Sequence, residues 1–164
     1  MFIESDNLMH TIVHSVVQAA PTVESRIGPT KEMMDVSVTF EAGTFYTRPG
    51  MNQWIGWTEV AQLIAGSFDW NTFKNVAPKS NLELFTENMA YGPRIKRQWE
   101  ETITELSIDP LSRRAVMFVG DANEALFNRP CTNSIQFLIR DDRLVTLVHM
   151  RSWDLFKGLP YDIT

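Results

Sequence analysis

Apolar positions recur at helical spacing near the start of the chain. Pro21 lies just past this pattern, and Ser5 or Asp6 could cap its beginning. The pattern predicts an amphipathic helix. Further helical patterns cover about residues 57–65, 81–90 and 94–107, and Asp109-Pro110 ends the last of them. The positions on one face of the first helix are Leu8, Ile12, Val13, Val16 and Val17.

Alternating or β-branched apolar runs predict strands, most of them in the last third of the chain. One short run covers residues 36–40, and the others cover 115–119, 135–139 and 144–150. Asp141-Asp142 separates the last two runs and predicts a tight turn between them. Residues 26–30 and 43–56 contain Gly and Pro and are typical of loops. Without repeats or linkers, the sequence predicts one α+β domain over residues 1–164.

Composition and charge narrow the classes of function. The chain has 164 residues, a formal charge of -5 and one cysteine. An acidic chain is a poor match for a polymeric nucleic acid, and a single cysteine excludes an internal disulfide, which favours a reducing, cytoplasmic compartment. No apolar run is long enough to span a membrane, and the N-terminus lacks the pattern of a secretory signal.

The candidate chemistry centres on Cys131, because arginines are concentrated in the same half of the chain. The thiolate form of cysteine is the nucleophile, and a nearby guanidinium favours the thiolate over the thiol. Guanidinium groups also bind phosphate. If adjacent strands bring Arg151 to Cys131, the two form an activated sulfur beside a phosphate anchor. The alternatives are an inert, buried thiol and ordinary surface arginines.

A second candidate is the pair His10 and His14, which share a helix face at i and i+4. Such a pair can bind zinc, but no third ligand is evident, so a solvated or packed pair is favoured and no metal site is predicted. Trp54, Trp57 and Trp70 could line a cofactor pocket, although core or surface packing is favoured.

The order and spacing of several motifs resemble the thymidylate synthase family. Within it, the chain is most similar to the cytidylate hydroxymethylase branch. The resemblance covers most of the chain and implies a mixed β-sheet with flanking helices. The motifs are Tyr91-Gly92, Ser112-Arg113-Arg114, Pro130-Cys131, Gln136-Phe137 and the run from Arg151-Ser152 through Asp154 and Gly158 to Asp162, with looser matches at Ser25-Arg26 and at Glu59 with Gly66.

The resemblance implies a reaction and a role for each matched residue. Cys131 would add to C6 of a pyrimidine nucleotide (dCMP, CMP or dUMP), and C5 would then attack the one-carbon unit of 5,10-methylenetetrahydrofolate. Glu59, Tyr91 and Arg151 would complete the catalytic set, and the chain would form a homodimer. The 5′-phosphate would be held by Arg26, Arg151 and Ser152, with Arg113 and Arg114 reaching from the partner subunit; Gln136, Asp154 and Asp162 would surround the base.

Two positions depart from the synthases that act on uracil. Asp162 stands where they have asparagine, and a protonated aspartate can donate to N3 of cytosine and accept from its 4-amino group. Burial would favour that protonated form. Thr132 stands where they have histidine. Asp162 favours a (deoxy)cytidylate 5-hydroxymethylase, and Thr132 argues less strongly against the alternative, a thymidylate synthase proper that acts on dUMP. The other interpretation of Asp162 is a solvated residue near the end of the chain.

The chain stops at Thr164, where members of the family continue. We therefore expect a C-terminally short domain with exposed apolar surface on its sheet. Three interpretations stay open: a fragment, half of a split enzyme, or a non-catalytic relative that binds a nucleotide or a partner chain.

Overall fold

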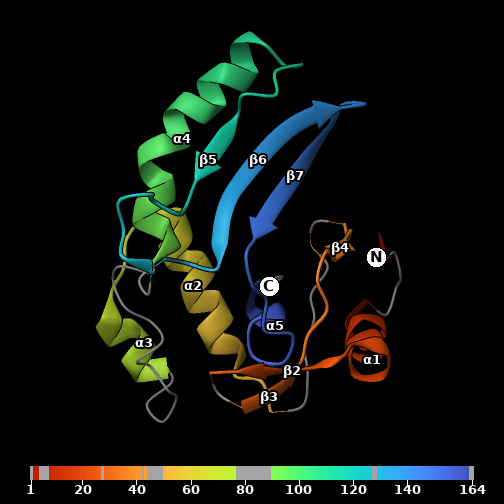
Figure 1. The fold of residues 1–164 in the computed structure, drawn as a ribbon. Helices are drawn as coiled ribbons and strands as arrows, with labels where there is room; N and C mark the ends of the chain where they lie inside the picture. The colour runs from red at the N-terminus through yellow and green to blue at the C-terminus, as the bar shows by residue number, and fades with distance from the viewer. Residues whose placement is uncertain are drawn as a thin grey trace. The chain divides into compact units, whose positions relative to one another are not determined.

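The computed structural model describes residues 2–3, 8–26, 28–41, 43, 50–76, 90–126 and 129–162. These residues form two compact units (Figure 1). One consists of Met1–Met51 with Asp154–Thr164, and the other is Asn52–Trp153. The single domain expected from the sequence stays a prediction.

The first unit contains the predicted N-terminal helix, α1 (Leu8–Ala19), together with four short strands and α5 (Leu159–Asp162). The expected caps Ser5 and Asp6 lie outside the described residues. The rings of His10 and His14 stack with centroids 5.8 Å apart. The strands are β1 (Phe2–Ile3), β2 (Thr22–Ser25), β3 (Gly28–Lys31) and β4 (Ser37–Val38), of which β1 pairs with β4 in parallel and β2 with β3 in antiparallel.

One loop prediction in this unit is wrong, because part of the segment 26–30 forms strand β3. Gly28 has a φ of 105°, a backbone conformation that suits glycine, and it allows the chain to reverse between β2 and β3. The Lys31 ammonium then donates to the Ala20 carbonyl at 2.9 Å, which ties the hairpin to the end of α1. The strand predicted over residues 36–40 shortens to two residues.

The second unit contains three helices and a three-stranded antiparallel sheet in the order β5-β6-β7. Asp141 and Asp142 form the turn between the last two strands, with φ values of 51° and 57°, which confirms the predicted turn. The predicted helix at 81–90 lies largely outside the described residues. The elements are α2 (Gln53–Ala65), α3 (Trp70–Val76), α4 (Tyr91–Ile108), β5 (Val116–Phe118), β6 (Thr132–Arg140) and β7 (Arg143–Met150).

The core of this unit lies between α4 and the sheet, where α4 runs along β5 and β6 (Figure 1). Ile95, Met117 and Val119 are buried there, and Ile135 and Phe137 of β6 pack against them. Helix α4 covers only part of the sheet. Apolar side chains of β7 are therefore exposed, including Leu144 at 63% and Val148 at 52%, as expected from the sequence.

The observed elements establish the α+β class but modify the expected sheet. The three-stranded sheet is wholly antiparallel, and the parallel pair β1-β4 is separate from it. None of the helices in the described part of the chain combines the length and the apolarity needed to cross a bilayer.

Candidate functional site

Strands β6 and β7 bring Cys131 and Arg151 together. The two strands pair through Thr132 and Met150, and just beyond them the Arg151 amide donates to the Cys131 carbonyl at 2.9 Å. The Arg151 guanidinium also binds the chain that leads into the cysteine, since Nε donates to the Pro130 carbonyl at 3.1 Å and Nη2 to the Arg129 carbonyl at 2.9 Å. A guanidinium carries five N–H donors, so Arg151 has donors left for a ligand. We call this part of the sheet the cysteine end.

The side chain of Cys131 is neither fully exposed nor sealed in the core. It is half-buried and makes no disulfide, whereas its neighbours Pro130 and Thr132 are buried. A partly accessible thiol between two fixed neighbours can react with a ligand and still keep a defined position.

A β-bulge follows the cysteine directly. The register between β6 and β7 shifts between Thr132 and Ser134, which leaves Asn133 as the extra residue. The Asn133 carbonyl accepts from the amides of Val119 and Gly120 at 2.9 and 3.2 Å. Bulges bend a strand and change the direction of its side chains, and they are common beside active sites. The sequence analysis did not predict this bulge.

Tyr91 approaches the cysteine end from the first turn of α4. The Thr132 amide lies 3.4 Å from the Tyr91 hydroxyl, which accepts from it. Gly92 permits this position, since a Cβ on it would lie 2.6 Å from the Gln62 carbonyl oxygen of α2. The start of α4 therefore packs directly on the backbone of α2, the helix that carries the half-buried Glu59.

The segment that leads to Cys131 is held by an ion pair that the sequence analysis missed. Arg94 donates to the Val119 carbonyl at 2.7 Å and forms a part-buried ion pair with Glu124. Arg129 donates to the Ala122 carbonyl at 2.9 Å. The hydrogen bond from Arg94 lowers the pKa of Glu124 below its ordinary value of 4.5.

We expect Glu124→Gln to lower the free energy of unfolding by about 1–3 kcal/mol at neutral pH, because it removes the carboxylate that pairs with Arg94. The pKa of Glu124 is lower in the folded state than in the unfolded state. The stabilisation is therefore complete at a pH above the unfolded-state pKa, and it is lost as the pH falls through the folded-state pKa. Urea titrations of both proteins should therefore differ at pH 7, and the difference should disappear as the pH falls through the folded-state pKa of Glu124. Glu100→Gln, on the exposed surface of α4, is the matched control. Equal stabilities at pH 7 would contradict the expected role of the pair.

The predicted residues Arg113, Arg114 and Gln136 lie farther along the sheet. Gln136 Nε2 donates to the Arg113 carbonyl at 2.7 Å, and the Ala115 carbonyl accepts from the Phe137 amide. From Cys131 to Phe137 the strand rises about 20 Å, more than an arginine side chain spans. Arg113 and Arg114 therefore do not reach the Cys131 of their own chain.

Arg114 has a partner within its own chain. Its guanidinium pairs with the Glu105 carboxylate at 2.8 Å, and the Ser112 hydroxyl donates to the same carboxylate. Two hydrogen bonds lower the pKa of Glu105: the bond from Ser112 has the larger effect, and the bond from Arg114 has the smaller one. A phosphate that binds Arg114 must compete with this carboxylate.

Three predicted residues, Arg26, Asp154 and Asp162, belong to the first unit. Arg26 is exposed after β2. Asp154 Oδ1 accepts from the amides of Phe156 and Lys157 at 2.9 and 2.8 Å, so it stabilises the turn that precedes α5. A Cβ on Gly158 would lie 3.2 Å from Asp162 Oδ2, so the turn brings Asp162 close to Gly158. Asp162 is exposed, and the burial expected to favour its protonated form is not observed.

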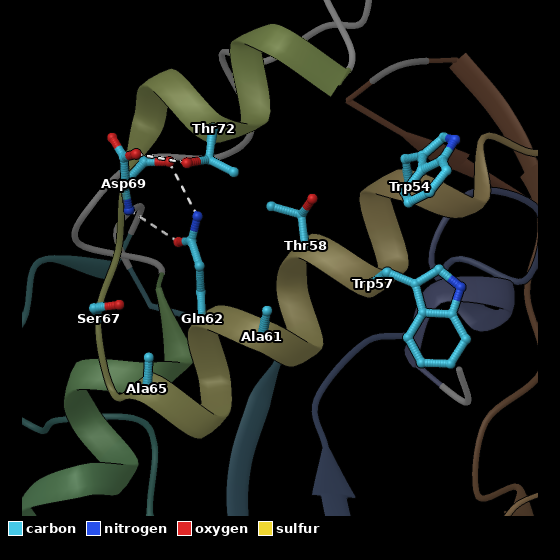
Figure 2. Close-up of a pocket in the computed structure, with 9 residues that line it drawn as sticks. All are labelled: Trp54, Trp57, Thr58, Ala61, Gln62, Ala65, Ser67, Asp69 and Thr72. Atoms are coloured by element: carbon cyan, nitrogen blue, oxygen red, sulfur yellow. Dashed lines mark hydrogen bonds between the residues drawn. The ribbon is translucent and has the colours of Figure 1, made fainter.

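A separate groove of about 420 Å³ lies beside α2 and α3 (Figure 2). Trp54 and Trp57 line one part of it, as considered from the sequence, whereas Trp70 and Glu59 are not among its lining residues. Its polar part is closed by mutual hydrogen bonds, because the Gln62 amide both donates to and accepts from the backbone of Asp69. Among the described residues, no group of three or more His, Cys, Asp or Glu side chains could hold a metal ion.

Comparison with known proteins gives one family. The family model described as thymidylate synthase matches residues 47–164. The thymidylate synthase of Aster yellows witches'-broom phytoplasma (strain AYWB) is 28% identical over 139 residues, which cover 75% of this chain and 48% of the relative. Two further relatives carry the same name.

The thymidylate synthase of Mycoplasma genitalium is 26% identical over 127 residues, which cover 70% of this chain and 44% of the relative. That of Mycoplasma pneumoniae is 29% identical over 83 residues, which cover 44% of this chain and 29% of the relative. The chain thus spans less than half the length of each of these three curated relatives.

Proposed function

Because the chain belongs to the thymidylate synthase family, we propose that it takes part in one-carbon transfer to C5 of a pyrimidine nucleoside monophosphate. The observation that carries this proposal is the cysteine end, where paired strands hold Arg151 against the peptide that carries Cys131. A nucleophile and a phosphate anchor at adjacent strand ends suit a substrate with a reactive ring and a 5′-phosphate.

In the proposed reaction, Cys131 adds to C6 of the ring and makes C5 nucleophilic. Arg151, Ser152 and Arg26 hold the phosphate, Gln136 and Asp154 order the base pocket, and Tyr91 with Glu59 moves protons. The position of Tyr91 supports this role, because its hydroxyl lies against the amide that follows Cys131.

Methylenetetrahydrofolate supplies the one-carbon unit when it is bound. The described residues fit such a co-substrate in one respect. Asp154 uses Oδ1 for two backbone amides, so Oδ2 can accept from the N–H groups of a pterin. Asp154 would then order both its own turn and the folate.

The proposed enzyme works as a homodimer. The separation of about 20 Å along β6 supports this, because Arg113 and Arg114 can serve a phosphate at a cysteine end only if that end belongs to another chain.

Two substrates are candidates, and the comparisons support the first of them better. The relatives named thymidylate synthase favour a uracil nucleotide, dUMP, and transfer of a methyl group. Asp162 and Thr132 favour a cytosine nucleotide, dCMP or CMP, and transfer of a hydroxymethyl group. Calorimetry of the full chain with the three nucleotides, with and without folate, separates these substrates. Binding without release of tritium from C5 would instead identify a non-catalytic nucleotide-binding relative.

We expect Asp162→Asn to shift the nucleotide preference from cytosine towards uracil by about ten- to a hundred-fold. The reason is that an amide accepts from N3–H and donates to O4 of uracil, whereas a carboxyl matches the opposite pattern of cytosine only in its protonated form. The exposed Asp162 would adopt that form only when a bound base covers it. The ratio of the Kd values for dCMP and dUMP measures the shift. Asp142→Asn, at the tip of the β6-β7 turn, is the control. An unchanged ratio in Asp162→Asn would exclude base recognition by this residue.

A further inference from the structure

The segment between β5 and β6 leads to Cys131, and Arg94 of α4 anchors the beginning of this segment. Arg94 Nη1 donates to the Val119 carbonyl at 2.7 Å and to Glu124 Oε2 at 3.0 Å, and Nη2 donates to Glu124 Oε1. The Asp121 amide donates to the same carboxylate at 3.2 Å. Only 12% of the Arg94 side chain is exposed, so water competes little for these contacts. The ion pair therefore holds the start of the segment in one defined turn.

Two further guanidinium groups continue from Glu124 to the cysteine. Arg129 Nε donates to the Glu124 carbonyl at 3.3 Å, so it binds the backbone of the residue that carries the carboxylate. The Arg129 carbonyl in turn accepts from Arg151 Nη2 at 2.9 Å, and Arg151 Nε donates to the next carbonyl, that of Pro130. One series of contacts therefore runs from α4 to Arg151, and the peptide that it fixes ends at Cys131.

The chain that follows Cys131 is anchored to the same place. The Asn133 carbonyl, at the bulge, accepts from the amide of Val119, the residue whose carbonyl binds Arg94. Val119 thus links Arg94 to the strand that follows the cysteine. The backbone on both sides of Cys131 therefore depends on contacts that Arg94 makes.

The fold of this unit has a separate support. Helix α4 packs on the sheet through the apolar core around Ile95 and Met117, which does not include the ion pair. The ion pair binds backbone groups of the segment instead. Its loss should therefore act mainly on the segment and leave the pairing of β6 with β7 in place.

We propose that Arg94 and Glu124 are positioning residues, which fix the Cys131 sulfur and the Arg151 guanidinium relative to each other for the reaction with the nucleotide. The inference rests on the proposed function and extends it, because that proposal gave neither residue a role. A displacement of about 1 Å at a reacting atom can lower a rate about a hundred-fold. Attraction between a guanidinium and a phosphate falls off more gradually with distance, so the chemical step should suffer more than nucleotide binding.

The test is Glu124→Gln, which keeps the size of the side chain and removes its charge. At saturating nucleotide, the rate of tritium release from C5 should fall about ten- to a hundred-fold, while the nucleotide Kd changes by less than about three-fold. Glu124→Asp, which restores the carboxylate on a shorter side chain, should recover part of the lost rate. An unchanged rate at saturation would overturn the inference, whether or not the nucleotide binds more weakly.

Two controls separate positioning from stability. Thr102→Ala removes a buried hydroxyl that donates to the Gln98 carbonyl at 2.8 Å within α4, so it should lower the urea midpoint and keep the wild-type rate. Glu100→Gln, on the exposed surface of α4, should change neither. If Thr102→Ala lowers the rate as much as Glu124→Gln does, the ion pair acts only through stability and the inference is wrong. Should Glu124→Gln not fold, Glu124→Asp takes its place, and a wild-type rate would then overturn the inference.

Hydrogen exchange tests the inference in the protein without ligand. In Glu124→Gln, the amides of Gly120 and Arg151, which bind carbonyls on either side of the cysteine peptide, should exchange faster. Their increase in exchange rate should exceed that of the Phe137 amide, in the middle of β6, by at least about ten-fold. Equal increases at the three amides would show a general loss of stability and would overturn the inference.

Failure of the inference differs from failure of the proposed function. If the wild type releases tritium and Glu124→Gln releases it at the same rate, only the inference is wrong. If the wild type releases no tritium with dCMP, CMP or dUMP, the proposed reaction is wrong. The exchange measurement then decides by itself whether the ion pair positions the peptide around Cys131.

Discussion

Replacing Cys131 with serine is expected to abolish nucleotide-dependent release of tritium from C5, a fall of at least about a thousand-fold. A serine hydroxyl is of similar size but is a much weaker nucleophile near neutral pH, so the ring is no longer attacked at C6. The half-buried site accepts this change without a large cavity. Nucleotide binding should therefore persist while the chemistry stops.

Three measurements make this prediction decisive. Tritium release reports the addition, calorimetry reports nucleotide affinity, and urea unfolding reports stability. Ser134→Ala, also on β6, is the control and should keep the wild-type rate. Because Cys131 is the only thiol of the chain, one alkylated product is expected, and bound nucleotide should slow its formation. Slow alkylation that nucleotide leaves unchanged would identify an inert thiol, and wild-type release by Cys131→Ser would exclude the nucleophilic role.

Replacing Arg151 with alanine is expected to weaken nucleotide binding by about a hundred-fold or more. This fold-change corresponds to the free energy of two charge-assisted hydrogen bonds to a phosphate. The same change removes the guanidinium that binds the Arg129 and Pro130 carbonyls, so the peptide before Cys131 loses two contacts. The rate of tritium release at saturating nucleotide should fall as well, because the sulfur is then less well positioned.

Arg151→Lys separates the two roles of this residue. Lysine keeps the positive charge, so part of the phosphate affinity should return, but an ammonium does not reproduce the planar pair of contacts to the two carbonyls. For Arg151→Lys we expect a nucleotide affinity between those of the wild type and Arg151→Ala, together with a rate of tritium release close to that of Arg151→Ala. Arg97→Ala is the control, because among the described residues its guanidinium donates only within α4, to the Pro93 carbonyl. If Arg151→Ala and the wild type bind the nucleotide with equal affinity, Arg151 does not hold the phosphate.

The proximity of Cys131 and Arg151 was predictable because it depends on a local rule. The two residues are almost equally far in sequence from the Asp141-Asp142 turn, and an antiparallel hairpin pairs residues that are equally far from its turn. The same rule places Arg140 opposite Arg143. That signal was present in the sequence, although the sequence analysis did not use it.

Features that depend on contacts between distant segments were not predictable in this way. The ion pair of Arg94 with Glu124 joins positions 30 residues apart, and no local pattern marks it. The bulge at Asn133 depends on two amides that follow β5. The helical pattern over residues 94–107 also does not show which side chains of α4 are buried. Thr102 is buried, whereas Trp99 stays 48% exposed, because α4 covers only part of the sheet.

The close approach at Gly92 has a consequence for proton transfer. The backbone of Gly92 lies on the last turns of α2, one turn after Glu59, and Tyr91 directly precedes the glycine. A carboxyl group and a phenol from separate helices are thereby carried on one rigid frame. Their separation should stay constant while other segments rearrange around a substrate, so the relay would be pre-organised before any ligand arrives.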